Sequence, residues 1–269
     1  SPAPALPVVE NFEYTTGTNL TSNGWVSHSA GGTNPIQVGA SPLTYSGYFA
    51  SGVGKSVTLN TSGEDDNHAF ASVNSGSMFA SFMVNLSAAQ IPGDYFFHMG
   101  PENSSTLFFG KVFVKKNAGD SVAFGIAKNV NGSVIYTPFN YDLNTTYLIV
   151  VKYTFNSGTT SDDEVKLWIN PVLNGTEPPA DVTQTDVGID ALSLGMFALR
   201  QGSATNSGTP TVGGIRAATT WIPGSGGSTF QLSVNIIDGW NMASVPGLHP
   251  VDQNVNTWWV NRNPLADVY

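Results

Sequence analysis

The segment TYLIVVKYTF, residues 146–155, is the most informative stretch of this 269-residue chain. It is apolar over much of its length and rich in β-branched and aromatic residues, as in a strand that is buried on both faces. The segment EVKLWIN, residues 164–170, follows it and alternates apolar with polar or amphipathic positions. Alternation with a period of two predicts a strand. Residues 146–155 are therefore predicted to be a central strand of a β-sandwich.

The same pattern recurs along the chain. Further strand-like segments occupy residues 77–86, 106–116, 121–128, 194–202, 213–221 and 229–236. Asn-Gly dipeptides at 23–24, 131–132 and 174–175 favour tight turns between strands. The only helical candidates are two short segments, LSAAQI (86–91) and DQNVNTWW (252–259). The sequence therefore predicts an all-β sandwich with short C-terminal β segments.

Composition divides the chain into four parts. Prolines extend an N-terminal arm over residues 1–7, and the sandwich is expected over 8–222. The stretch PGSGGS, residues 223–228, has the composition of a flexible linker. Residues 229–269 then read as a partial second β unit or a strand-donating tail, because about forty residues are few for an independent core without disulfides.

Charge and cysteine content exclude several classes of function. Ten Lys and Arg against nineteen Asp and Glu give a net charge of −9. This balance argues against nucleic acid and against anionic membrane surfaces as partners. No apolar run is long enough to span a bilayer, and the absence of cysteine excludes disulfides and thiol chemistry. Few charges, many Asn, Ser and Thr residues, and a start that looks like the end left by signal-peptide removal favour a secreted, cell-surface protein.

Six motifs resemble one family. They are ENFEYTTGTNLTSNGW (10–25), GDYFFHMG (93–100), TTYLIVVKYTF (145–155), VKLWINP (165–171), FALRQG (197–202) and GIRAATTW (214–221). In this order they resemble the concanavalin/laminin-G-like jelly-roll modules of secreted, multidomain surface proteins of Bacteroidota, which are often exported by the type IX route. The resemblance covers roughly residues 8–222 and implies a jelly-roll fold. The segment GWNMASVPGLHP (239–250) resembles the start of a small β domain that follows such modules.

The resemblance also bears on calcium. Related modules often carry Asp before the GIR motif, where it helps to hold a structural calcium ion, and here Gly213 precedes the motif that begins at Gly214. Glu10 on the first strand could still contribute to such a site. A second calcium hypothesis comes from consecutive side-chain oxygens, which suit this hard cation. These residues are Glu64, Asp65, Asp66 and Asn67. The alternative is an ordinary solvated acidic loop.

No catalytic constellation is evident. The clusters at 64–66 and 162–164 are contiguous and lie between predicted strands, so they are interpreted as solvated loops and not as the spaced carboxylate pair of a glycosidase. No Gly-x-Ser-x-Gly motif is present. The four histidines are scattered, without the spacing of metal ligands. We therefore expect a protein that is not an enzyme.

Aromatic and polar residues suggest a sugar-binding face. Carbohydrate binders stack sugar rings on aromatic side chains and fix hydroxyl groups with polar ones. The candidates for one such face are Tyr95, His98, Trp168, Arg200 and Gln201. The alternative for each is a packing role, and for Trp168 a place over the edge of the core.

The ends of the chain suggest self-assembly, because exposed terminal strands can pair with a neighbouring copy. The candidate assembly residues are Val8, Val9, Phe230, Leu232, Val234, Ile236, Trp258 and Trp259. The leading hypothesis is a non-catalytic structural or adhesive surface protein that associates with its own copies or with other surface proteins, with a filament as one form of such an assembly. A lectin-like, glycan-binding module is the alternative, and a glycoside hydrolase is a weaker one. Residues 229–269 could equally be the remnant of a longer protein.

Overall fold

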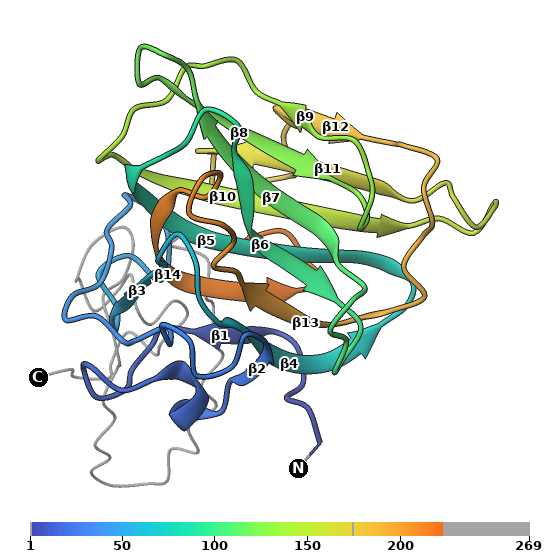
Figure 1. The fold of residues 1–269 in the computed structure, drawn as a ribbon. Coiled ribbons are helices and arrows are strands. Elements are labelled where there is room, and N and C mark those ends of the chain that lie inside the picture. Colours follow the sequence, from blue (N-terminus) through green and yellow to red (C-terminus); the bar gives the residue numbers. More distant parts are fainter. Residues whose placement is uncertain (1, 174, 223–269) are drawn as a thin grey trace, which may run out of the picture.

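The computed structural model describes residues 2–173 and 175–222, and they form a sandwich of two antiparallel sheets, each with seven strands (Figure 1). The first sheet has the order β1-β14-β5-β10-β11-β12, and β3 also pairs with β14. Its strands are β1 (Val8–Glu10), β3 (Ser56–Thr58), β5 (Gly76–Ala88), β10 (Thr146–Phe155), β11 (Glu164–Ile169), β12 (Val182–Gln184) and β14 (Thr209–Ala218).

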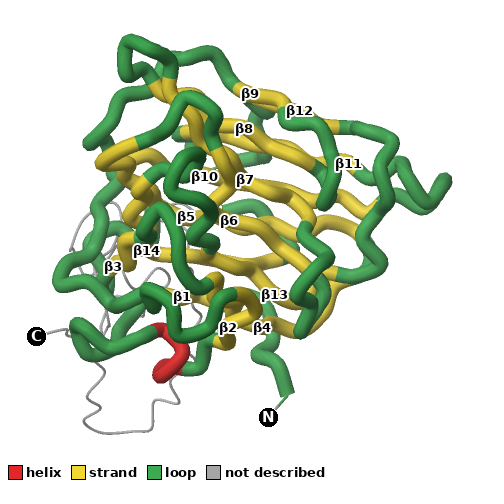
Figure 2. The backbone as a smooth tube through the Cα atoms, viewed as in Figure 1, coloured by secondary structure: helices red, strands yellow, loops and turns green. Residues whose placement is uncertain are grey.

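The second sheet has the order β2-β4-β13-β6-β7-β8-β9. Its strands are β2 (Val26–Ser29), β4 (Asp65–Val73), β6 (Asp94–Gly100), β7 (Phe109–Lys116), β8 (Val122–Ala127), β9 (Ile135–Tyr136) and β13 (Leu194–Leu199). A single 3-10 turn, η1 (Leu20–Asn23), is the only helical element in the described part of the chain (Figure 2). None of the described helices is long and apolar enough to cross a membrane.

The central strand is β10, as the composition of residues 146–155 predicts. It pairs with β5 on one side and β11 on the other. Ile149, Val151 and Tyr153 point into the core between the sheets. Leu148 and Val150 point outward and are equally buried. The side chains on the two faces of β10 thus pack into two different apolar clusters, one between the sheets and one on the outside of the first sheet.

The outward layer is a second apolar cluster on the outside of the first sheet. Trp168 and Phe79 lie in it beneath Trp221, with ring centroids 5.0 and 6.0 Å from that indole, respectively. Tyr48 closes the cluster from the loop before β3 and donates a 2.7 Å hydrogen bond from its hydroxyl to the carbonyl oxygen of Gly214. Gly214 has a φ of 59°, and a Cβ there would lie 2.7 Å from Ala50. Glycine at this position thus allows the loop to pack against β14.

The predicted all-β jelly-roll sandwich is confirmed. The predicted helix at LSAAQI is wrong, because residues 86–88 continue β5 and residues 89–91 are non-helical loop. Val8 and Val9 lie in β1 and pair with β14. The linker and the other assembly candidates, Phe230, Leu232, Val234, Ile236, Trp258 and Trp259, lie outside the described residues, as does the predicted helix at 252–259.

Candidate functional site

The outer face of the second sheet carries an unusual set of side chains, which begins on β7. Val112 and Val114 point into the core. Alternation along the strand then directs Lys111, Phe113 and Lys115 to the outer face. Two lysines four positions apart on an extended strand are separated by about 13 Å along the sheet. The strand thus presents two cationic groups with an aromatic ring between them.

Two tyrosines from neighbouring strands join this row. Tyr95 on β6 is paired with Phe113, and their ring centroids are 5.3 Å apart. Tyr136 on β9 packs edge-on against Phe113 from the other side, at 6.4 Å. Its ring lies across Gly125 of β8, where a Cβ would be 2.7 Å from the ring. Glycine at 125 therefore lets Tyr136 lie over the strand.

Cationic groups lie over these rings. The guanidinium carbon of Arg200 is 4.0 Å from the ring centroid of Tyr95, and the ammonium group of Lys115 is 3.9 Å from that of Tyr136. The ammonium group of Lys111 is 5.0 Å from the Tyr95 centroid. These distances are those of cation–π contacts. Because cations occupy one face of each tyrosine ring, the surface is a cationic aromatic patch, defined here by Tyr95, Lys111, Phe113, Lys115, Tyr136 and Arg200.

The charges of the cationic aromatic patch are only partly neutralised. Arg200 forms an ion pair with Asp94 at 2.8 Å, and Asp65 lies 3.9 Å away. Lys111 donates to the carbonyl oxygen of Val130 at 2.7 Å. Among residues 2–173 and 175–222, neither Lys111 nor Lys115 has a carboxylate within ion-pair distance.

Lys111 is also nearly buried, with 6% of its surface exposed. Burial, and secondly the positive charge of Arg200, lower the pKa of Lys111 to about 8. A lysine with such a pKa is partly neutral in mildly alkaline solution. It can act as an acid or a base there, which an ordinary lysine cannot.

His98 adjoins this patch but is covered. It is fully buried, and its ring lies 4.1 Å from that of Phe108 and 5.5 Å from that of His28. Burial lowers the pKa of both histidines, that of His28 to about 4, so both rings are neutral at pH 7. His98 therefore packs beneath the surface and does not offer its ring to a ligand.

The structure brings together some of the predicted sugar-binding residues and separates others. Tyr95 and Arg200 are in contact, with His98 beneath them. Gln201 is buried, and its side chain links three backbone groups, those of Asn60, Asn34 and Glu64. Trp168 lies on the other sheet, 1% exposed, and donates from its indole nitrogen to Pro178. The prediction that Trp168 shares a face with the others is wrong, because its strand belongs to the first sheet.

The predicted calcium ligands also divide. Glu10 accepts hydrogen bonds from the backbone nitrogen of Phe12 and from the side chains of Tyr14 and Trp25. Both of its carboxylate oxygens therefore already have donors within the protein. Asp65 accepts from the backbone nitrogen of Gln201 at 2.8 Å.

Asn67 donates to the carbonyl oxygen of Val26. Glu64 and Asp66 retain oxygens without donors among the described residues. All four residues from 64 to 67 are buried, so the interpretation of this cluster as a solvated loop is wrong.

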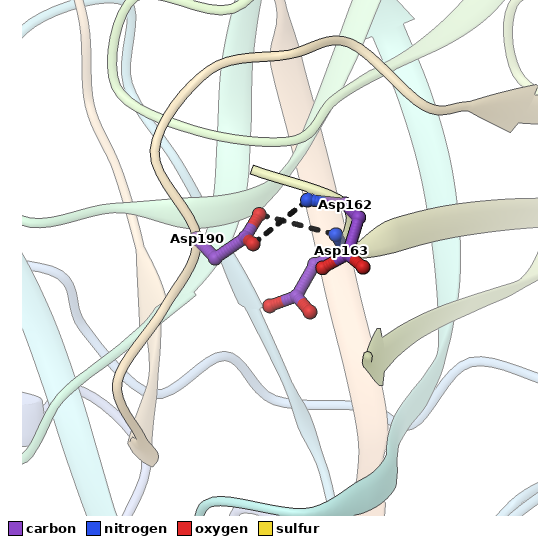
Figure 3. A group of neighbouring side chains, drawn as sticks. All are labelled: Asp162, Asp163 and Asp190. Carbon is purple, nitrogen blue, oxygen red and sulfur yellow. Dashed lines mark hydrogen bonds between the residues drawn. The ribbon is translucent and has the colours of Figure 1, made fainter. Parts of the chain in front are cut away.

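A third acidic group brings together Asp162, Asp163 and Asp190 (Figure 3). Asp190 accepts from the backbone nitrogens of Asp162 and Asp163, at 2.9 and 3.1 Å. It also forms a 2.7 Å ion pair with Lys128, whose side chain is fully buried. Asp163 accepts from Tyr153 at 2.7 Å. A lysine and backbone amides thus supply positive charge and hydrogen-bond donors to this cluster, and Oδ1 of Asp162 has no donor among the described residues.

Sequence reasoning missed Lys111, Lys115 and Tyr136. The two lysines share a face because of the alternation in FGKVFVKK, residues 109–116, which the strand prediction already contains. Tyr136 has no such signal: it reaches the patch through a two-residue strand, β9, and through the glycine at 125.

Comparison with known proteins identifies the fold and no family. No family model and no curated protein matches the chain. A mutant of alginate lyase Aly36B, solved in complex with alginate tetrasaccharide, is similar in structure with a TM-score of 0.54 and 14% identity. The match covers 82% of this chain and 99% of that one.

Two further similar structures have lower scores. The endo-β-1,4-glucuronan lyase of Trichoderma reesei has a TM-score of 0.44 at 9% identity, over 76% of this chain and 98% of that one. The metal-free carbohydrate recognition domain of Emp46p has 0.46 at 9%, over 81% and 97%. The Aly36B match, at 14% identity, establishes a shared jelly-roll β-sandwich and no more than the fold.

Proposed function

We propose that the chain binds a saccharide that carries carboxylate groups, such as a uronate oligosaccharide, on the cationic aromatic patch. The observation that carries this proposal is the placement of Lys111, Lys115 and Arg200 on one sheet face, in a chain with only ten Lys and Arg in all. Two of these cations have no carboxylate partner in the described part of the chain. An anionic ligand would supply the missing countercharge.

The geometry favours an acidic saccharide over a neutral one. A neutral sugar ring needs a bare aromatic face for stacking, whereas Tyr95 and Tyr136 each have one face occupied by a cation. The separation of about 13 Å between Lys111 and Lys115 along the strand suits an oligosaccharide with repeated charges. The alginate in the Aly36B structure is an acidic saccharide bound by a protein of this fold, which supports the proposal.

A binding comparison with matched variants tests this proposal. Oligomers of uronic acids and neutral oligomers of glucose are titrated into the protein at low and at physiological salt. We expect the acidic oligomers alone to bind, and salt to weaken their binding. Lys115→Met should weaken binding roughly tenfold, the effect of one charge-assisted contact. Lys116→Met is the control, because Lys116 forms an ion pair with Asp120.

Two outcomes would exclude the proposal. In one, neutral oligomers bind as well as acidic ones. In the other, Lys115→Met and Lys116→Met have equal effects.

A second candidate function is cleavage of such a saccharide by β-elimination, which is favoured by the lowered pKa of Lys111. In its neutral form, this lysine would remove the proton next to the uronate carboxylate, and Arg200 would stabilise the negative charge that develops there. The electron pair left behind would form a carbon–carbon double bond as the neighbouring glycosidic C–O bond breaks, and the leaving oxygen would take a proton from water. The cleaved product therefore contains a new carbon–carbon double bond. Its ultraviolet absorbance therefore tests this function, and Lys111→Met should abolish the absorbance change. If the acidic oligosaccharide binds but the ultraviolet absorbance does not change, the protein binds the saccharide without cleaving it.

Self-association through terminal strands and export to the cell surface stay predictions. In support of the former, β1 is an edge strand among the described residues, where it pairs with β14 alone, and Val9 is 44% exposed. Light scattering tests the assembly: large regular particles are expected, and a monodisperse monomer at high concentration would contradict it.

A further inference from the structure

Two acidic clusters of this chain differ in how their charge is balanced. The cluster of Asp162, Asp163 and Asp190 contains a buried lysine, and each of its carboxylates accepts at least one hydrogen bond. The carboxylates of Glu64 and Asp66 have no such cation among the described residues. This difference identifies the second cluster as the one that lacks a countercharge.

Glu64 and Asp66 are deeply buried at the start of β4. They are 2% and 0% exposed, respectively. Three of their four carboxylate oxygens, Oε1 of Glu64 and both oxygens of Asp66, have no hydrogen-bond partner in the described part of the chain. The remaining oxygen of Glu64 accepts from the backbone nitrogen of Gly32 at 2.6 Å.

The carboxyl group of Asp66 lies close enough to that of Glu64 for their negative charges to repel each other. Buried carboxylates without donors are costly, and two of them in contact repel each other as well. A bound cation would remove both costs.

The surrounding chain holds this pair in place. The loop between β2 and β3 is bound to it through Gly32 and through the backbone nitrogen of Glu64, which donates to Thr33 at 2.7 Å. Gln201 ties the same loop to Glu64 by bonds to Asn34 and to the Glu64 carbonyl oxygen. The pair is thus enclosed by three separate segments and fixed before any ion arrives.

We propose that Glu64 and Asp66 bind a calcium ion in this enclosed position. Calcium prefers hard oxygen ligands, and three unpartnered carboxylate oxygens supply part of a shell of roughly six to eight. Backbone carbonyl groups or water would supply the rest. Asp65 and Asn67 lie outside this ligand set, because they contact Gln201 and Val26 instead. The inference does not depend on the proposed saccharide.

Calcium chloride titrated into the full chain, after dialysis against a chelator, tests the proposal. Calorimetry should give one ion per chain, and the melting temperature should rise with calcium concentration. Asp66→Asn should abolish both effects. Its chelated form should melt no lower than chelated wild type, because one buried negative charge is gone. Asp120→Asn, at an exposed carboxylate, should leave both effects unchanged.

Three results would overturn the proposal. The first is the absence of both heat and melting shift in millimolar calcium. The second is calcium binding that survives Asp66→Asn but is lost in Asp162→Asn. The third is a chelated protein that is stabilised by mild acid and does not respond to calcium, because the carboxyl pair then shares a proton.

Discussion

Replacement of Lys128 by methionine should destabilise the protein strongly. The Lys128 side chain is fully buried, and its ammonium group donates to Asp190 at 2.7 Å and to the carbonyl oxygen of Ser161 at 3.2 Å. Methionine keeps the apolar stem but removes the charge. Asp190, whose side chain is 11% exposed, then remains close to Asp162 and Asp163 without a cation.

The magnitude follows from this burial. Removal of one partner of a buried ion pair costs about 3–5 kcal/mol. Two backbone nitrogens continue to donate to Asp190, which places the expected loss near the lower end, about 3 kcal/mol. The free energy of unfolding, from urea denaturation in chelator-containing buffer, measures this loss. The variant should still fold, since a domain typically has about 5–15 kcal/mol of stability.

Lys116→Met is the control, because the Lys116–Asp120 pair is exposed to solvent. It should change the free energy of unfolding by less than about 1 kcal/mol. A loss below about 1 kcal/mol in Lys128→Met would refute the reasoning. It would mean that Lys128 is not the cation on which the cluster of Asp162, Asp163 and Asp190 depends.

Three further predictions concern the cationic aromatic patch and the opposite sheet. Gly125→Ala should displace the Tyr136 ring, lower stability by about 1–3 kcal/mol and weaken saccharide binding in titrations. Gly119→Ala, where a Cβ would make only an ordinary 3.5 Å contact with the Asn117 side chain, should do neither. Saccharide affinity should fall as the pH rises through about 8, because Lys111 loses its proton there. Lys111→Arg should remove this pH dependence. If affinity in Lys111→Arg still falls over the same pH range, Lys111 is not the group responsible. Trp168→Ala should lower the free energy of unfolding by about 3–5 kcal/mol and leave the saccharide affinity of the remaining folded protein unchanged, because Trp168 lies on the other sheet. A loss of affinity would instead place the ligand on the first sheet.

The fold could be predicted from the sequence because its signals are local. Residues 146–155 are apolar on both faces, and the structure covers both faces of β10 with apolar clusters. Alternation likewise locates β7 and β11. The failure at LSAAQI shows the limit: residues 86–88 extend β5 through pairing with β14, a contact between distant segments.

The candidate site could be predicted only in part, because sheet membership is not a local property. Trp168 lies in β11 of the first sheet, whereas Arg200 directly follows β13 of the second sheet. The burial of residues 64–67 could not be predicted from the sequence either. It depends on Gln201 and on the loop around Gly32, which meet β4 only in the folded chain.

Backbone amide chemical shifts during titration with a uronate oligosaccharide would test the central claim most directly. We predict shifts that saturate and that gather on β6, β7 and β9, around Tyr95, Lys115 and Tyr136, while β10 and β11 stay unchanged. Shifts confined to β10 and β11, or none at saturating ligand, would contradict the assignment of the cationic aromatic patch as the binding face.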